Sequence, residues 1–273
     1  MYCLENEELR VEVSPHGCEL KSIFHKKSGQ EVLYDGKGEW GYSDHVLFPI
    51  IAENNSFSIG GKPYCIKTRH GFCRNSDFSL VKKTDDSLTL SLIHEADDTY
   101  PFNCEILVTT RLEKNALIRD AEVHSLDHKE MPFQYGLHPA FVCSFGEANL
   151  EVASGTILLE ENQGLIKRRI PWEKEESWQV ERGYIEERDT LVVTNPKGRI
   201  ALHNGTGRTI ALLSSCPYFA IWTPQKACKN DFLCLESWYG LSPYEGMGDE
   251  LMDRDHAQKT KDTASYHDVL IIE

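Results

Sequence analysis

Hydrophobic and polar residues alternate along much of the chain. The alternation is clear over residues 9–13, 87–93 and 105–112, and it resumes over residues 116–123 after the short connection Lys114-Asn115. A period of two residues is typical of a strand with one face against a core and the other toward solvent. We therefore predict strands in these four segments, with the last two joined as a hairpin.

The second half of the chain repeats this pattern. Alternating or apolar runs cover residues 190–194, 199–203, 209–214 and 268–272, and turns rich in asparagine and glycine separate the first three. We find no amphipathic segment of three helical turns with capping residues at both ends. Because turn signals recur about every ten residues, the pattern favours a β-sandwich over a parallel α/β fold. We predict an all-β fold, a large antiparallel β-sandwich.

The composition narrows the classes of protein that fit. The chain has 273 residues, with 29 Lys and Arg against 43 Asp and Glu, which gives a net charge of −14. A surface this acidic repels the phosphates of nucleic acids and of anionic membranes, so we expect neither as a partner. We see no linker or repeat that divides the chain, and we predict a single domain over residues 1–273.

Cysteine use and the missing targeting signals predict a cytoplasmic protein. The nine cysteines are odd in number and include no Cys-x-x-Cys pair, which is typical of reduced thiols. The first residues are acidic rather than apolar, and no apolar stretch reaches the length of a membrane-spanning helix.

The most charged segment covers residues 158–189. We interpret it as a solvated excursion between strands, because charge runs are usually solvated. Elsewhere, His124 and His128 are four residues apart at the end of a strand, where this spacing does not bring two ligands together. The sequence carries no phosphate-binding glycine loop and no zinc-protease motif, so we predict neither a metal nor a cofactor.

Three segments place polar groups inside apolar or aromatic surroundings: residues 69–74, 131–141 and 231–240. In the third, Glu236 interrupts a strongly apolar strand, so this carboxylate has either a structural partner or a raised pKa and a function. In the second, His138 lies among aromatic residues, and a satisfied core histidine is the alternative to a functional one.

Aromatic side chains gather near both groups. Trp222 and Trp238 are the candidates for contacts with a ligand. Aromatic faces beside a few polar groups suit the apolar face of a sugar ring, although packing in an aromatic core is the competing interpretation.

At these residues the chain resembles a known family, the aldose 1-epimerases or galactose mutarotases, and in particular their compact LacX-like bacterial subgroup. The resemblance covers nearly the whole chain. The matching motifs, in order, lie at residues 17–23 (GCELKSI), 47–50 (LFPI), 70–74 (HGFCR), 100–102 (YPF), 131–141 (MPFQYGLHPAF) and 232–240 (FLCLESWYG). Each motif is short, but their joint order and spacing make the match specific.

The resemblance implies a galactose mutarotase-like supersandwich with an open cleft for a sugar. It also implies that Glu236 is the general base, that His138 is the general acid and that His70 is a second active-site histidine. Arg74 matches the arginine of the HGFCR motif and is a candidate for substrate binding. A small sugar, a hexose such as galactose or glucose, is the implied partner.

One position departs from the family pattern. Relatives commonly place a sugar-contacting arginine after LFPI, whereas this chain has Glu53 at that place. The next residue, Asn54, can donate a hydrogen bond to a sugar but has no guanidinium fork. The change bears on the affinity for the substrate or on its identity, and not on the acid–base pair.

The implied reaction interconverts the α and β anomers of a free aldose by opening the ring, and it asks for one base and one acid near the working pH. Two other functions stay open. A non-catalytic carbohydrate-binding protein is one, and a hexose-6-phosphate mutarotase with a recess formed by Lys67, Arg69 and Arg74 is the other. A glycosidase with two carboxylates ranks last, because the sequence singles out only one buried carboxylate, Glu236.

Overall fold

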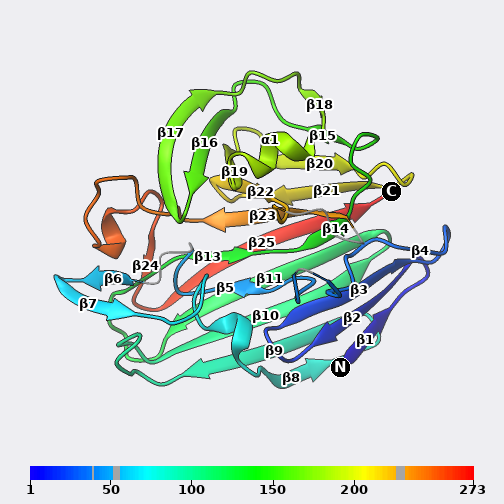
Figure 1. The fold of residues 1–273 in the computed structure, drawn as a ribbon. Coiled ribbons are helices and arrows are strands. Elements are labelled where there is room, and N and C mark those ends of the chain that lie inside the picture. The colour runs from blue at the N-terminus through cyan, green and yellow to red at the C-terminus, as the bar shows by residue number, and fades with distance from the viewer. Residues whose placement is uncertain (39, 52–55, 226–230) are drawn as a thin grey trace.

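The computed structural model describes residues 1–38, 40–51, 56–225 and 231–273, and most of its regular structure is β-strand (Figure 1). These residues form 25 strands, one short α-helix, α1 (Arg182–Glu186), and two 3-10 helices, η1 (Cys73–Asn75) and η2 (Leu251–Asp253). All strand pairs are antiparallel, which confirms the predicted fold class.

The larger of the two main sheets has nine strands. In spatial order they are β18 (Ser177–Gln179), β15 (Asn149–Glu151), β20 (Arg199–His203), β21 (Thr209–Ser214), β25 (Thr263–Ile272), β11 (Ala116–Ser125), β10 (Cys104–Glu113), β9 (Ser87–His94) and β8 (Ser79–Lys83). The predicted hairpin is confirmed, because β10 and β11 pair from Glu113 and Ala116 outward. Lys114 makes the turn with a positive φ of 54°.

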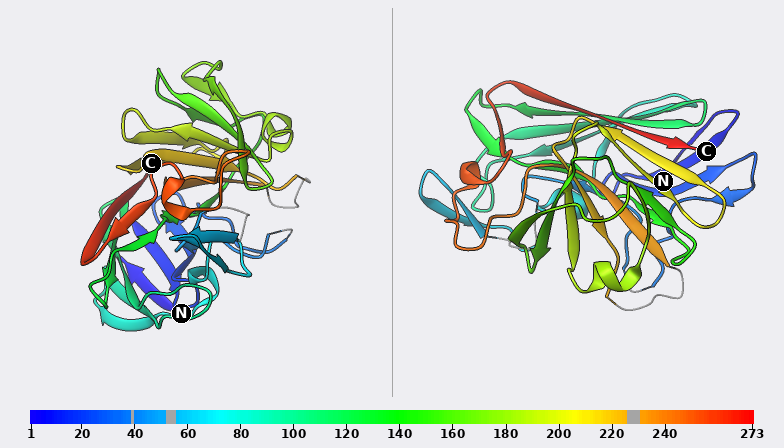
Figure 2. Two further views of the ribbon diagram at one scale, coloured as in Figure 1. Left: turned by 90° about the vertical axis from the view of Figure 1, so that its left-hand side faces the viewer. Right: turned by 90° about the horizontal axis from the view of Figure 1, so that it is seen from above.

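The second main sheet has eight strands and carries the residues that matter below. Its order is β17 (Leu165–Pro171), β16 (Ile157–Asn162), β19 (Thr190–Thr194), β22 (Tyr218–Trp222), β23 (Phe232–Tyr239), β13 (Tyr135–Leu137) and β5 (Val46–Leu47), and β14 (Ala140–Val142) also pairs with β23. The two main sheets lie against each other as layers (Figures 1 and 2).

Three small sheets complete the fold. The four-stranded one contains β1 (Tyr2–Glu5), β2 (Leu9–Ser14), β3 (Glu19–His25) and β4 (Gln30–Glu31). The two-stranded ones pair β6 (Ser56–Ile59) with β7 (Lys62–Cys65) and β12 (Met131–Phe133) with β24 (Gln258–Thr260).

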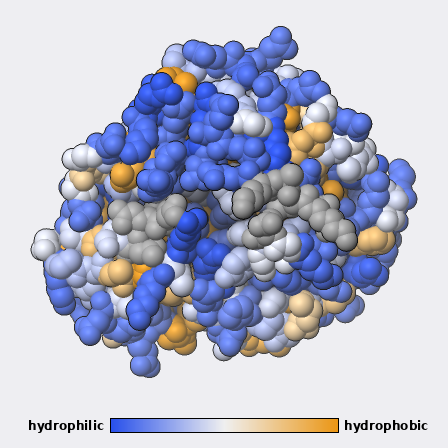
Figure 3. Space-filling view, viewed as in Figure 1, coloured by the Kyte–Doolittle hydropathy of each residue, from blue (hydrophilic) through white to orange (hydrophobic). Residues whose placement is uncertain are grey.

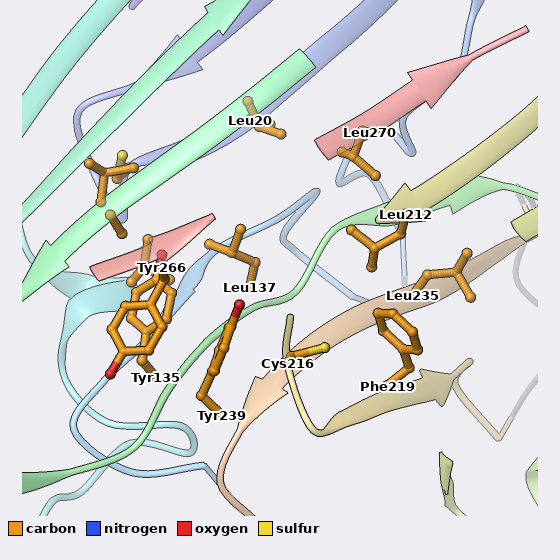
Figure 4. Close-up of a cluster of buried hydrophobic side chains, with 14 of the residues drawn as sticks. Leu20, Tyr135, Leu137, Leu212, Cys216, Phe219, Leu235, Tyr239, Tyr266 and Leu270 are labelled. Atoms are coloured by element: carbon orange, nitrogen blue, oxygen red, sulfur yellow. The ribbon is translucent and has the colours of Figure 1, made fainter. Parts of the chain in front are cut away.

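A hydrophobic core fills the space between the main sheets. Figure 4 shows part of it, with side chains from both layers: Leu212, Tyr266 and Leu270 from the nine-stranded sheet, and Leu137, Leu235 and Tyr239 from the eight-stranded one. The Tyr266 ring lies 4.4 Å from the Tyr135 ring and 4.5 Å from the Tyr239 ring, measured between centroids. Tightly packed rings of this kind hold the layers in register.

Strand β23 is buried on both faces along its whole length. Successive side chains of a strand point to opposite sides, so Leu233, Leu235 and Tyr239 enter the core between the sheets. Glu236 and Trp238 point to the other face. This double burial explains why the strand is almost continuously apolar and why one carboxylate stood out in it.

The interpretation of residues 158–189 as a solvated excursion is wrong. This segment contains most of β16 and all of β17, β18 and α1, and β16 lies inside the eight-stranded sheet. Glu160 and Glu161 are buried on β16, and Glu160 is neutralised by Arg168 and Arg188. The charge density of the sequence did not reveal that ion pairs allow Glu160 to be buried in this strand.

The face of the molecule in Figure 3 is mostly hydrophilic, and hydrophobic residues show on it singly or in small groups. Among the described residues, no helix is long and apolar enough to cross a membrane.

Candidate active site

A cavity of about 200 Å³ opens on the face of the eight-stranded sheet that points away from the core between the sheets. Six predicted site residues line it: Glu236, His138, His70, Arg74, Trp222 and Trp238. The remaining prediction, Asn54, lies outside the described residues, as does Glu53. Segments far apart in the sequence therefore supply one shared cavity.

Glu236 lies at the buried end of this cavity. Its side chain is only 1% exposed. One carboxylate oxygen, Oε2, accepts a hydrogen bond of 2.8 Å from the indole Nε1 of Trp238, two residues further along the same face of β23. The other oxygen, Oε1, lies 3.2 Å from Nε2 of His138. Both oxygens thus have fixed neighbours.

Backbone pairing on both sides of His138 brings it to Glu236. β13 pairs Leu137 with Ser237, and β14 pairs Ala140 with Cys234, so the chain on either side of His138 is bound to the same strand. The backbone N–H of His138 donates to the carbonyl of His45 at 3.1 Å. The imidazole therefore has little freedom to leave the carboxylate.

Burial moves the pKa values of this pair in opposite directions. It raises the pKa of Glu236 well above 4.5, and the nearby charge of Glu161 adds to the rise, while the Trp238 hydrogen bond opposes it. Burial also lowers the pKa of His138 well below 6.5, with further contributions from His70 and Arg74. Between these two pKa values the pair holds one proton, which can lie on either partner.

The HGFCR segment is fixed against the LFPI segment. The N–H of Phe48 donates to the His70 carbonyl at 3.1 Å, and the N–H of Phe72 donates to the Phe48 carbonyl at 3.0 Å. Gly71 has a φ of 83°, and a Cβ at this position would collide with the Phe48 carbonyl, so only glycine fits. The two motifs therefore form one unit that presents His70 to the cavity.

His70 and Arg74 line the same side of the cavity. Burial lowers the pKa of His70 to about 3, with smaller contributions from the positive charges of Arg74 and Arg69, so its imidazole is neutral. The guanidinium of Arg74 lies 4.2 Å above the centre of the Tyr42 ring. This cation–π contact helps to hold the Arg74 guanidinium at the cavity lining.

Sequence reasoning missed His45. Its ring stacks on that of His138, with centroids 4.6 Å apart and planes 23° apart. The side chain is fully buried, and neither ring nitrogen has a hydrogen-bond partner among the described residues. A histidine two residues before LFPI, at the start of an apolar run, is the signal in the sequence that could have found it.

Trp40 was also missed. Its ring lies 5.0 Å from that of His138 in a stacked arrangement and 5.7 Å from that of Trp222, edge to face. Trp40 lines the cavity from the connection between β4 and β5. Because it lies outside any periodic segment, no local pattern marks it.

The GCELKSI motif contacts the segment that directly precedes His45. The carboxylate of Glu19 accepts a hydrogen bond of 2.7 Å from the N–H of Ser43. Asp44 forms a fully buried ion pair with Arg119 at 2.5 Å and accepts a hydrogen bond from the N–H of Leu20. Together these contacts fix the backbone next to His45.

The expectation of a single buried carboxylate is wrong. Glu161 is also buried, lines the cavity from β16 and accepts a hydrogen bond of 2.7 Å from the Ser242 hydroxyl. Asp189 and Thr190, where β19 begins, line the cavity beside it. Acidic side chains therefore line the cavity at Glu236 and also at Glu161 and Asp189.

Among the described residues, one cluster brings three groups of the metal-ligand type together: His138, Cys234 and Glu236, whose ligand atoms lie within 4.8 Å of one another. Burial, and then the charge of Glu236, raises the pKa of the Cys234 thiol well above 9.0, so this sulfur keeps its proton. The chemistry that the site supports directly is proton transfer between His138 and Glu236.

Known proteins share this fold. A galactose mutarotase related enzyme from Lactobacillus acidophilus superposes with a TM-score of 0.92 at 22% identity, over 100% of this chain and 97% of that one. A galactose mutarotase-like protein from Lactobacillus casei superposes with a TM-score of 0.91 at 21% identity, over the whole of both chains.

Sequence comparison gives the family. The chromosomal LacX protein of Lactococcus lactis subsp. lactis is 27% identical over 290 residues, which cover 94% of this chain and 93% of LacX. The model of the family described as aldose 1-epimerase matches residues 1–245, and this span includes all the predicted site residues. The chain therefore belongs to the aldose 1-epimerase family.

Proposed function

We propose that this protein is a mutarotase that interconverts the α and β anomers of a free hexose such as galactose or glucose. One observation carries the proposal: a buried carboxylate and a buried imidazole lie 3.2 Å apart at the end of a cavity that has aromatic walls. Membership of the aldose 1-epimerase family supports an aldose epimerase-like function.

The reaction needs one proton to leave and one to arrive. Glu236 takes the proton of the C1 hydroxyl while His138 gives a proton to the ring oxygen, and the bond between C1 and the ring oxygen breaks. The aldehyde then rotates about the bond between C1 and C2. Closure on its other face reverses both transfers and returns the enzyme to its starting state.

The pair can supply this chemistry without a net proton from solvent. In the empty cavity, burial favours the proton on Glu236 and a neutral His138. Transfer across the 3.2 Å contact gives the carboxylate and the imidazolium, which is the form in which Glu236 is the base. Because only the position of one proton changes, the pair serves ring opening and ring closing equally.

The walls of the cavity suit a monosaccharide. Trp222 and Trp238 offer apolar surface for the C–H face of a sugar ring. Neutral His70 can hydrogen-bond the oxygen of the open aldehyde and retain it until the ring closes. The volume of about 200 Å³ is below that of sites for drug-sized ligands, and it therefore favours one sugar ring over an oligosaccharide.

Polarimetry or NMR on freshly dissolved α-D-galactose and α-D-glucose tests the proposal. We expect the protein to accelerate equilibration of the anomers for at least one of the two. An equilibration rate equal to that of buffer for both sugars contradicts the proposal. Saturable sugar binding without such acceleration would instead support a non-catalytic carbohydrate-binding protein.

The cytoplasmic location and the absence of a metal or cofactor stay predictions from the sequence. The eight described cysteines are free, which fits a reducing compartment.

A further inference from the structure

A second cavity, which we call the core cavity, lies between the two main sheets and has a volume of about 10 Å³. Figure 4 labels four of the apolar side chains that line it: Leu20, Leu137, Leu212 and Leu270. Three polar residues also line it: Arg119 on β11, Asp268 on β25 and Ser237 on β23. A cavity of this size has room for about one water molecule.

The three polar residues bring unpartnered groups to the core cavity. Asp268 and Arg119 are only 3% and 2% exposed, and Ser237 is fully buried. Among the described residues, neither carboxylate oxygen of Asp268, nor the Ser237 hydroxyl, nor Nε of Arg119 has a hydrogen-bond partner of normal geometry. Because polar groups without partners are costly to bury, these atoms indicate a site for a small polar ligand.

Asp268 is opposite Arg119 in the pairing of β25 with β11, but the terminal nitrogens of this guanidinium have other partners. They bind the Asp44 carboxylate at 2.5 Å and donate to the Cys18 carbonyl at 2.9 Å. Burial raises the pKa of Asp268 to about 6, and the opposing effects of Ser214, Ser237 and the charge of Arg119 are smaller. Above this pH the carboxylate is charged and needs hydrogen-bond donors.

The core cavity lies behind the proposed acid–base pair. Ser237 follows Glu236 on β23, and successive side chains of a strand point to opposite faces, so Ser237 lines the core cavity while Glu236 lines the active-site cavity. Leu137 and Pro139, the two chain neighbours of His138, line the core cavity as well. Contacts that fix these backbone segments from the core side therefore also fix the pair.

We infer that the core cavity binds one water molecule, which links Asp268 on the nine-stranded sheet to Ser237 on β23 and makes Asp268 a positioning residue for Glu236. The water accepts a hydrogen bond from Nε of Arg119 and donates to the Asp268 carboxylate and the Ser237 hydroxyl. About three hydrogen bonds are usual for a buried water. The positioning role rests on the proposed function, whereas the bound water does not.

A crystal structure at a resolution that shows ordered waters tests the binding site. We expect one water in the core cavity, within about 3.2 Å of Arg119, Asp268 and Ser237. In Asp268→Leu the larger apolar side chain should displace this water and shift the Glu236 carboxylate relative to His138. In Asp268→Asn both should stay in place, because an amide can still hydrogen-bond the water. Direct contacts of Asp268 with Ser237 and Arg119, with no water between them, overturn the inference.

Kinetics tests the positioning role. In Asp268→Leu we expect kcat for hexose mutarotation to fall about tenfold with KM little changed, because a displaced catalytic group lowers the rate. Asp268→Asn should recover most of kcat. Ser237→Ala removes one partner of the water with a smaller change in size, and it should also lower kcat, which keeps the test decisive where the Leu variant does not fold.

The matched control is Asp120→Leu. This aspartate also lies on a strand of the nine-stranded sheet, β11, but its carboxylate binds the exposed His267, so kcat should stay at the wild-type value. A wild-type kcat in a folded Asp268→Leu variant, or an Asp268→Asn variant as impaired as Asp268→Leu, overturns the positioning role.

Failure of the proposed function gives a different result. If the wild-type protein does not accelerate mutarotation, crystallography still measures the water and the shift of Glu236 in Asp268→Leu. If the wild-type protein is an active mutarotase and Asp268→Leu keeps its kcat, the proposed function holds and the positioning role of Asp268 does not.

Discussion

The two ends of the cavity differ in the partners that stabilise their buried titratable side chains. At the end that we call the catalytic end, after the proposed acid–base pair, Glu236 and His138 are buried next to each other. Burial raises the pKa of Glu236 and lowers that of His138, which favours a neutral pair that needs no counter-ion. On the side of the cavity formed by β16 and β19, the Ser242 hydroxyl donates to Glu161, and its neighbour Glu160 is neutralised by Arg168 and Arg188. The first arrangement places two titratable groups within reach of one proton, whereas the second satisfies carboxylates with hydroxyl and guanidinium donors.

This difference shows that burial alone is not enough to identify a catalytic carboxylate. Glu236 and Glu161 are both nearly inaccessible to solvent and line the same cavity. Glu236 lies 3.2 Å from the imidazole of His138, whereas the Ser242 hydroxyl donates a hydrogen bond to Glu161. We therefore expect substitutions at the catalytic end to change the rate for every sugar.

The largest expected effect is on the rate when the base is removed. Glu236→Gln keeps the size of the side chain but cannot accept the C1 proton, and we expect kcat for hexose mutarotation to fall by roughly 10³-fold. Polarimetry at substrate saturation measures this. Glu160→Gln is the control and should retain most of the rate. A Glu236→Gln variant with near wild-type kcat contradicts the assignment of the base.

The next effect concerns stability. Arg119→Met leaves the Asp44 carboxylate buried without its ion-pair partner behind the catalytic end, and we expect a loss of about 3–5 kcal/mol in the free energy of unfolding. Arg168→Met removes a largely exposed partner of Glu160, to which Arg188 also binds, and should cost at most about 1 kcal/mol. Chemical denaturation of the two variants compares them. Equal losses in the free energy of unfolding would contradict this difference between the buried and the exposed ion pair.

The pH dependence distinguishes a shared proton from a fixed charge. Below the lowered pKa of His138 both partners carry a proton, and above the raised pKa of Glu236 neither does, so kcat should be bell-shaped and fall about tenfold per pH unit on either side. Because the charge of Glu161 raises the pKa of Glu236, Glu161→Gln should move the alkaline side of the profile to lower pH. A profile without an alkaline side, or one that Glu161→Gln moves upward, contradicts this account.

The smallest effect is expected from His45, which we consider a positioning residue. His45→Ala removes the ring stacked on His138, and we expect kcat to fall about tenfold with KM little changed, since misplacing a catalytic group lowers the rate. His45→Phe restores a ring of similar shape without titratable nitrogens and should recover most of the rate. If the Phe variant is as impaired as the Ala variant, the role of His45 is not stacking.

The strands were largely predictable from local patterns. Segments 199–203 and 209–214 coincide with β20 and β21, because alternation reports directly which face of a strand is buried. The pattern failed at residues 158–189, where ion pairs and a hydroxyl allow glutamates to be buried in β16. A sequence shows how much charge a segment carries, but not whether another strand supplies the compensating group.

By itself, the sequence determined the all-β fold and the identity of most groups that line the cavity, since short motifs and an apolar strand interrupted by Glu236 are local features. Only the tertiary structure decided how these groups meet. The 3.2 Å contact between His138 and Glu236 depends on two strands pairing with β23 on either side of His138, and the ring of His45 beside it comes from a third segment. The pKa values were decided there too, because desolvation and the field of a neighbouring charge depend on distances that a one-dimensional pattern does not contain.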